Sequence, residues 1–464
     1  MADWSIKDLE EWNEKIEALV KEMGLDCYPQ EFEICDYHDM LGYQSYSGMP
    51  SRYPHWSFGK SFEKQKMVYQ HGMGGLAYEI VINTNPCLAY LMIDNPLSMQ
   101  ILTMAHVFGH NDFFKNNIHF SQTRADLALE MFKRHANRVR SYIEDPGIGY
   151  EKVERILDAA HAISFQCDRN AFLRALTESD FRKRSDNKAQ EDKWEHLTYK
   201  NGHQNVEVKP DLEYDLILFI RDNQPFLSEW EKDLLTIVRD ETQYFLPQME
   251  TKIMNEGWAS FWHYTILNRL NLPPNIHMDF IRSHNQVIRP HVGGLNPYHI
   301  GYCLFNKLAG SDGHQIEYEI NKQIFDVRRI DRDSSFLRRF LTQELAQELH
   351  LFEYSTQGNT TYISEIADKH GWEKVRESLI SNIGLNSIPI IQVKEISSKN
   401  ELILKHNYDN RELELKYLEK TLEHVNTLWA NTVIIETVID NQPTRFKYKN
   451  GKFSRMADKP ENKL

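Results

Sequence analysis

A change of residue pattern near position 340 constrains the fold of this chain more than any other feature. Before it, the segments with a clear period are mainly helical, as in 248–270. After it, short runs such as TVIIETVI (432–439) surround one helical segment, RELELKYLEKTLEHVNTLW (411–429). We therefore expect an α+β protein with a mainly helical domain over 1–340 and a small α+β domain over 341–464.

Two apolar runs within the helical part predict a small hairpin. YEIVIN (78–83) and CLAYLMI (87–93) flank the turn sequence TNP (84–86). A helix is expected to begin near Pro96, because proline is tolerated in a first helical turn. Residues 25–60 are rich in aromatic residues, glycine and proline and show no sustained helical period. We predict an irregular, well-packed lobe there.

The charge of the chain argues against some classes of partner. It carries 54 basic and 67 acidic residues, a net charge of −13. Charge-driven binding to nucleic acid or anionic lipid needs a surplus of basic groups, so we expect neither. Residues 1–24 predict an acidic amphipathic helix rather than a signal sequence, and no apolar run reaches membrane-spanning length. We expect a cytoplasmic protein.

The cysteines argue against a thiolate metal site. They are odd in number, scattered, and without a Cys-x-x-Cys pair, a pattern typical of reduced thiols. They are Cys27, Cys35, Cys87, Cys167 and Cys303. A metal in this protein would therefore be held by histidines and carboxylates.

The segment AHVFGHNDFFKNN (105–117) contains the sharpest local signal. His106 and His110 are four residues apart in a predicted helix, so both side chains project from one face. This geometry suits two ligands of one metal ion. Two histidines at this spacing are also common as hydrogen-bonded core groups, and the motif needs partners to indicate a metal.

A second segment, MNEGWASFWHY (254–264), supplies a carboxylate. It resembles the helix that delivers the third zinc ligand in gluzincin aminopeptidases, which implies a gluzincin-like helical domain and makes Glu256 the third ligand. Gluzincins carry their general base directly after the first histidine, where this chain has Val107. His263, on the same helix face as Glu256, is a further ligand, a group that orients Glu256, or a core histidine.

A third predicted helix, YEKVERILDAAHAI (150–163), offers a replacement for the missing base. Glu154, Asp158 and His161 lie on one continuous face. Glu154 or Asp158 could accept the proton, and the pair Asp158 and His161 has the spacing used in two-metal helical bundles, with His161 as a ligand. The alternative is a solvated polar stripe, which is the usual role of charged residues on a helix.

The loop SHNQVIRPHVGGLNPYHIG (283–301) adds polar residues beside glycines and prolines, which suit a rigid wall over a site. Tyr298 is the candidate to stabilise a developing oxyanion, with aromatic packing as its alternative role. His284, His291 and Asn296 are the other polar candidates of this loop.

Long blocks across nearly the whole chain closely resemble the stage V sporulation protein R family. These blocks are GLDCYPQEFEICD (24–36), GMPSRYPHWSFGK (48–60), YEIVINTNPCLAYLM (78–92), AHVFGHNDFFKNN (105–117), VERILDAAHAI (153–163), MNEGWASFWHYTILN (254–268), LNPYHIGY (295–302) and HVNTLWANTVIIETV (424–438). The resemblance implies a cytoplasmic bacterial protein connected with spore cortex and peptidoglycan assembly, and with stationary phase or stress in other species. It also implies association with a PrkA-like serine kinase and a von Willebrand-type partner protein.

Three functions remain open at this stage. The first is a zinc-dependent hydrolase of a peptide or amide bond, with a water activated by the metal as nucleophile. The second is a non-catalytic regulatory scaffold that keeps its metal and acts by binding partners. The third is a two-metal oxidase or phosphatase built from the helix with Asp158 and His161.

Overall fold

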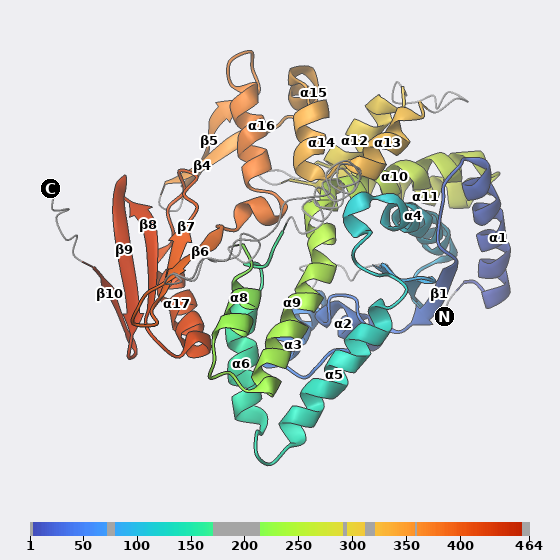
Figure 1. Ribbon diagram of the computed structural model, residues 1–464. Helices are drawn as coiled ribbons and strands as arrows, with labels where there is room; N and C mark the ends of the chain where they lie inside the picture. Colours follow the sequence, from blue (N-terminus) through green and yellow to red (C-terminus); the bar gives the residue numbers. More distant parts are fainter. Residues whose placement is uncertain are drawn as a thin grey trace, which may run out of the picture. The chain divides into compact units, whose positions relative to one another are not determined.

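The computed structural model describes six stretches of the chain, which are 3–71, 79–169, 214–290, 295–310, 321–357 and 360–456. Helices and small sheets are both present, and the predicted α+β class is confirmed (Figure 1). His291 lies outside the described residues. Among the described residues, no helix combines the length and the apolar character that a membrane span requires.

The chain divides into two compact units, each built from two segments. The first unit comprises Met1–Arg138 and Phe245–Ser387, and the second comprises Val139–Tyr244 and Ile388–Leu464. Helices α5 (Ala128–Glu144) and α9 (Glu229–Glu250) each run through a boundary between these segments.

The first unit contains the remaining helices and strands of its two segments. They are α1 (Ile6–Glu22), β1 (Gln30–Cys35), α2 (Tyr37–Ser45), α3 (Trp56–Gln70), β2 (Glu79–Ile82), β3 (Cys87–Met92), α4 (Leu97–Asn116), η1 (Ile118–Phe120), α10 (Lys252–Arg269), α11 (Pro274–Val287), α12 (Pro297–Leu308), α13 (Gln323–Ile330), α14 (Asp333–Phe340), α15 (Gln343–Glu348), β4 (Phe352–Gln357), β5 (Thr360–Ile366), α16 (Trp372–Ser381) and η2 (Gly384–Ser387).

The predicted hairpin is confirmed, and it belongs to a three-stranded sheet. Strand β2 pairs antiparallel with β3, and β3 pairs parallel with β1 in the order β1-β3-β2. The irregular lobe expected over 25–60 is wrong, because β1, α2 and the start of α3 occupy it. Asp36 explains the start of α2, since its carboxylate accepts the backbone N–H groups of His38 and Asp39.

Helices α4 and α10 form the centre of the first unit. Both are buried on nearly all faces, as their apolar sequences require, and α10 packs against α4 and α12. Small residues let these helices approach closely: a Cβ on Gly257 would lie 2.3 Å from Gly301 of α12, and one on Gly109 would lie 2.6 Å from Cα of Ala259. Asp333 fixes the start of α10 by accepting the first backbone N–H groups, those of Ile253 and Met254, at 2.9 Å.

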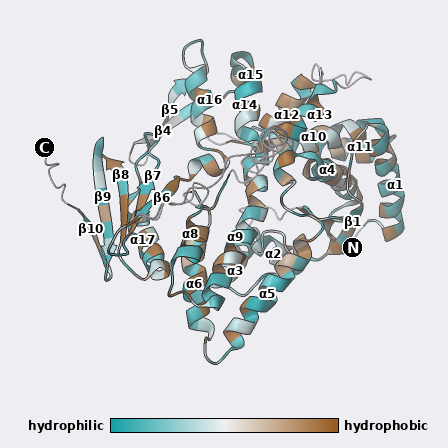
Figure 2. Cartoon of the chain, in the orientation of Figure 1, coloured by the Kyte–Doolittle hydropathy of each residue, from teal (hydrophilic) through white to brown (hydrophobic). Residues whose placement is uncertain are grey.

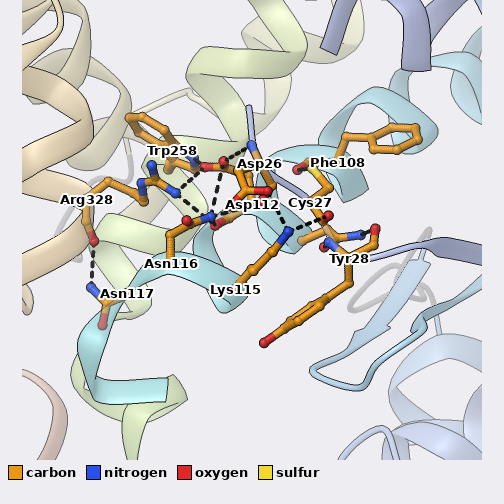
Figure 3. Close-up of polar contacts among 11 residues, drawn as sticks. Asp26, Cys27, Tyr28, Phe108, Asp112, Lys115, Asn116, Asn117, Trp258 and Arg328 are labelled. Atoms are coloured by element: carbon orange, nitrogen blue, oxygen red, sulfur yellow. Dashed lines mark hydrogen bonds and ion pairs between the residues drawn. The ribbon is translucent and has the colours of Figure 1, made fainter. Parts of the chain in front are cut away.

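A buried ion pair joins α4 to α13, and a hydrogen bond to the same carboxylate joins α4 to α10 (Figure 3). The Asp112 carboxylate lies 3.1 Å from a guanidinium nitrogen of Arg328 and accepts the indole N–H of Trp258 at 2.8 Å. It also accepts the backbone N–H of Asp26 at 2.8 Å. Burial raises the pKa of Asp112 to about 6, although the charge of Arg328 opposes that rise. These bonds anchor α4 two residues after His110.

The second unit is a sheet with helices. Besides its parts of α5 and α9, it contains α6 (Tyr150–Ala162), α8 (Leu216–Asn223), β6 (Ile391–Ile396), β7 (Leu402–His406), α17 (Leu415–Trp429), β8 (Val433–Ile439), β9 (Gln442–Lys449) and β10 (Lys452–Arg455). The strand order is β10-β9-β8-β7-β6, and only β7 and β8 pair in parallel among the described strands of this sheet.

The parallel pair is connected by α17, as a crossover between parallel strands requires. The apolar stripe of α17 (Leu418, Leu422, Val425, Leu428) is buried, and the helix packs against β8, β9 and α6. In Figure 2, β8 is largely hydrophobic, whereas α1 of the first unit is mostly hydrophilic with a narrow buried stripe. The strands and helix predicted for the tail are confirmed.

Candidate metal centre

Three of the five candidate metal ligands, His106, His110 and Glu256, come together in the first unit. The Glu256 carboxylate oxygen Oε2 lies 3.5 Å from Nε2 of His110 and 3.8 Å from Nε2 of His106. All three candidate ligand atoms lie within 4.8 Å of one another. His106 and His110 are on adjacent turns of α4, and Glu256 is on α10, so the packing of these two helices creates the group.

Two further side chains border the group. Glu79, on strand β2, places Oε1 4.0 Å from Nε2 of His106. Tyr298 lies in the first turn of α12, and its ring stacks on His106 at 6.2 Å between centroids. The negative charge of Glu256, together with burial, raises the pKa of Tyr298. Tyr298 therefore keeps its proton and acts as a donor.

The protonation states suit cation binding. Burial alone would raise the pKa of Glu256, but its interactions with His106, His110 and Tyr298 outweigh burial and lower that pKa. Burial, reinforced by the nearby His106, lowers the pKa of His110 to about 4. At neutral pH the group thus offers an ionised carboxylate and a neutral imidazole. Burial and the charge of Glu256 raise the pKa of Glu79, although His106 opposes the rise.

The other ring nitrogens of both histidines are hydrogen-bonded. Nδ1 of His110 lies 2.9 Å from Oδ1 of Asn255, which can only accept, so His110 is protonated at Nδ1 and its Nε2 carries a lone pair. Nδ1 of His106 lies 2.9 Å from Nδ1 of His263. Histidine ligands of metals usually donate their second N–H to such a partner, which orients the ring.

His263 was predicted as a further ligand, an orienting group or a core histidine. It is fully buried, and one of its ring nitrogens lies within hydrogen-bond distance of the predicted ligand His106. Its second nitrogen, Nε2, lies 2.7 Å from Nδ1 of His284 on α11. His263 therefore contacts the predicted ligand His106 through one ring nitrogen and His284 through the other.

The structure does not bring the third predicted helix into this group. Glu154, Asp158 and His161 lie on α6 in the second unit, half-buried, and the ligand group found among the described residues does not include them. Glu154 accepts a hydrogen bond from the Tyr150 hydroxyl at 2.6 Å. Their roles as proton acceptor and ligand stay predictions.

Glu79 and Asn255 are the site residues that sequence reasoning missed. Asn255 directly precedes Glu256, so its helix position could have indicated it. Glu79 lies in the predicted hairpin, where a single glutamate is normally a solvent-facing residue of an alternating strand. Only the contact of β2 with α4 reveals it.

Comparison with known proteins identifies the family. The model for SpoVR like protein matches residues 3–388, and the model for the SpoVR-like C-terminal domain matches residues 389–440. The chain belongs to the SpoVR-like family. The resemblance inferred from its sequence blocks is thereby confirmed, and the match to the C-terminal domain begins one residue after Ile388, where the last segment of the second unit starts.

One relative of this SpoVR-like chain covers nearly its whole length. The uncharacterized protein YcgB of Escherichia coli (strain K12) is 32% identical over 472 residues, which cover 94% of this chain and 92% of that protein. No solved structure matches the chain. The gluzincin likeness therefore depends on the residues of the site alone.

Proposed function

We propose that this SpoVR-like protein binds one divalent metal ion, most suitably zinc, through His106, His110 and Glu256. The supporting observation is the Oε2 atom of Glu256, which is buried and has no hydrogen-bond partner among the described residues. Such an atom normally carries a substantial energetic cost. A cation between Oε2 and the two Nε2 atoms would remove this cost, and two imidazoles with one carboxylate are a common zinc set.

We further propose a hydrolase that cleaves a peptide or amide bond, in keeping with a role in peptidoglycan assembly. A zinc ion held there would supply Lewis-acid activation of a carbonyl group and of water. Glu79, whose Oε1 lies 4.0 Å from Nε2 of His106, is our candidate to accept the proton of the attacking water. The Tyr298 hydroxyl, which keeps its proton, can donate to the developing oxyanion.

Elemental analysis of the purified protein tests the metal site. Wild-type protein expressed with added metal should contain about one zinc per chain, in line with a three-ligand site. His110→Ala and Glu256→Gln should lose it, whereas the control His406→Gln should not, because His406 belongs to the second unit. Metal-free wild type, or unchanged content in both site variants, would refute the proposal.

The proton acceptor is tested with variants that keep the metal. With peptidoglycan fragments as substrate, Glu79→Gln should lower turnover by a factor of about 10² or more, a typical loss for a removed general base. Glu154→Gln and Asp158→Asn test the acceptor predicted from the sequence. If these two variants lose turnover while Glu79→Gln keeps full activity, the proton acceptor is on α6 and Glu79 is not the base.

The alternative is a metal-holding scaffold without catalysis. It is favoured by Val107, which occupies the position of the gluzincin base. Such a scaffold would act with a PrkA-like serine kinase and a von Willebrand-type partner, the associations that the family resemblance implies. Full function of Glu79→Gln, Glu154→Gln and Asp158→Asn in cells, with loss in metal-free variants, would support this alternative.

A further inference from the structure

Three buried imidazoles form a continuous chain that begins at a ligand of the proposed metal centre. His106 Nδ1 lies 2.9 Å from His263 Nδ1, and His263 Nε2 lies 2.7 Å from His284 Nδ1. The exposed fractions of the three residues are 4%, 0% and 2%. They come from three different helices, α4, α10 and α11, so their alignment is a property of the tertiary structure.

Hydrogen-bond chemistry allows this chain only two ordered arrangements. A neutral imidazole has one donor nitrogen and one acceptor nitrogen. Both nitrogens of His263 are engaged, so it must donate to one neighbour and accept from the other. Either His106 Nδ1 donates to His263, which donates to His284, or both bonds run in the opposite direction.

Only the first arrangement leaves His106 able to bind a metal. When His106 Nδ1 carries the proton, Nε2, which lies 3.8 Å from Glu256 Oε2, has a lone pair available for a metal. In the reverse arrangement Nε2 carries the proton and cannot coordinate. His110 has the corresponding arrangement through a simpler partner, the Asn255 oxygen, which can only accept.

We infer that His263 and His284 are positioning residues that hold His106 in its metal-binding tautomer. This inference rests on the proposed metal centre and assigns a role to residues behind the ligands. Partners in this position typically contribute a factor of about 10 to 100 in metal affinity. Metal binding at His106 would in turn fix the proton of His284 at Nε2, because His284 Nδ1 must then accept the hydrogen bond that His263 donates.

Aromatic packing is the competing explanation for His263. Its ring centroid lies 6.4 Å from that of Phe280, and the ring of the adjacent Tyr264 lies 4.6 Å from His284. Under that explanation, phenylalanine should replace His263 well and glutamine should not. The positioning role predicts the opposite order. In H263Q the amide oxygen can accept from His106 Nδ1 and the amide nitrogen can donate to His284 Nδ1, whereas H263F can do neither.

The experiment is a zinc affinity measurement by competition with a chromogenic chelator. H263F should bind zinc about 10 to 100 times more weakly than wild type, and H263Q within a few-fold of it. H406F is the matched control, since His406 is 4% exposed and hydrogen-bonded to Thr437 at 2.9 Å in the second unit. It should bind like wild type.

The outcomes separate this inference from the proposed function. Wild-type protein that binds no zinc refutes the metal centre itself. Wild type that binds zinc, with H263F equal to it or tighter than H263Q, refutes the positioning role alone. If H263F does not unfold cooperatively, the same comparison is made with H284F and H284Q, of which only H284Q retains an acceptor for His263. Equal affinity in those two variants would then overturn the inference.

Discussion

Replacing Gly257 with alanine should disturb both the helix packing and the proposed metal centre. The added Cβ would lie 2.3 Å from both Cα and C of Gly301, and 2.8 Å from its oxygen. Carbon atoms in contact are about 3.5–4.0 Å apart, so α10 and α12 would have to separate by more than about 1 Å. Rotamer changes cannot relieve the overlap, because the opposing atoms are backbone.

The expected magnitude follows from two opposing effects. Alanine is a better helix former than glycine by about 1 kcal/mol, which favours the variant. Overpacking a close-packed interior costs about 1–3 kcal/mol, and occasionally more. Since the contact is backbone against backbone, we expect the upper end of this range and a net destabilisation of about 2 kcal/mol. Glu256 is the adjacent residue, and Tyr298 lies on the helix that must move, so zinc affinity should fall as well.

The assay is urea unfolding followed by a zinc titration. Gly59→Ala is the control, because Gly59 is also helical and its Cβ would meet nothing within 4 Å among the described residues. That variant should be neutral or slightly more stable, with unchanged zinc affinity. If Gly257→Ala unfolds at the wild-type urea concentration and binds zinc normally, the packing argument is refuted.

Two further predictions concern buried charge. Arg328→Met leaves the buried Asp112 carboxylate without its guanidinium partner and should lower the free energy of unfolding by about 3–5 kcal/mol. The double variant Arg328→Met with Asp112→Asn should recover part of that loss. Equal stabilities of the single and double variants would contradict this prediction. Burial lowers the pKa of both His110 and His284 to about 4 in the folded chain, against 6.5 for free histidine. The unfolded chain therefore binds more protons in this range, so the stability of metal-free protein should fall as the pH is lowered from about 6.5 to 4. Urea unfolding midpoints measured across this pH range check the prediction. The midpoint of His284→Gln should decline less steeply than that of wild type. A wild-type midpoint that is constant between pH 7 and 4.5 would contradict the prediction.

The sequence predicted those parts of the fold whose signals are local. The hairpin β2–β3 and the strands of the tail follow from periodicity and turn residues. Strand β1 did not, because it is short and is stabilised by parallel pairing with β3, more than 50 residues later in the chain. Helix α2 has only nine residues and little apolar periodicity, so its main signal is the cap at Asp36.

In the candidate site too, the residues with a local sequence signal could be predicted and those that depend on tertiary contacts could not. His106 and His110 were predictable because one helix fixes their spacing, and Glu256 was predictable from its sequence context. Glu79 was not, because its role depends on β2 lying beside α4. The hydrogen-bond partner of His263 could not be predicted either. Helix periodicity puts His263 on the same face as Glu256, but its ring nitrogen lies 2.9 Å from His106.

The exposure of the residues at the proposed metal centre bears on whether the metal would be structural or catalytic. Structural zinc sites are closed by four protein ligands, whereas catalytic sites keep one position open. Here the imidazole side chains of His106 and His110 are only 5% and 8% exposed, but the carboxylate side chains of Glu256 and Glu79 are 18% and 20% exposed. The carboxylate side chains are thus more exposed than the imidazoles, although the candidate ligand atom, Oε2 of Glu256, is buried. A catalytic and a structural site make different predictions for Glu79. In the hydrolase, Glu79→Gln should keep the zinc and lose turnover, whereas zinc lost together with Glu79 would make Glu79 a fourth ligand and the site structural.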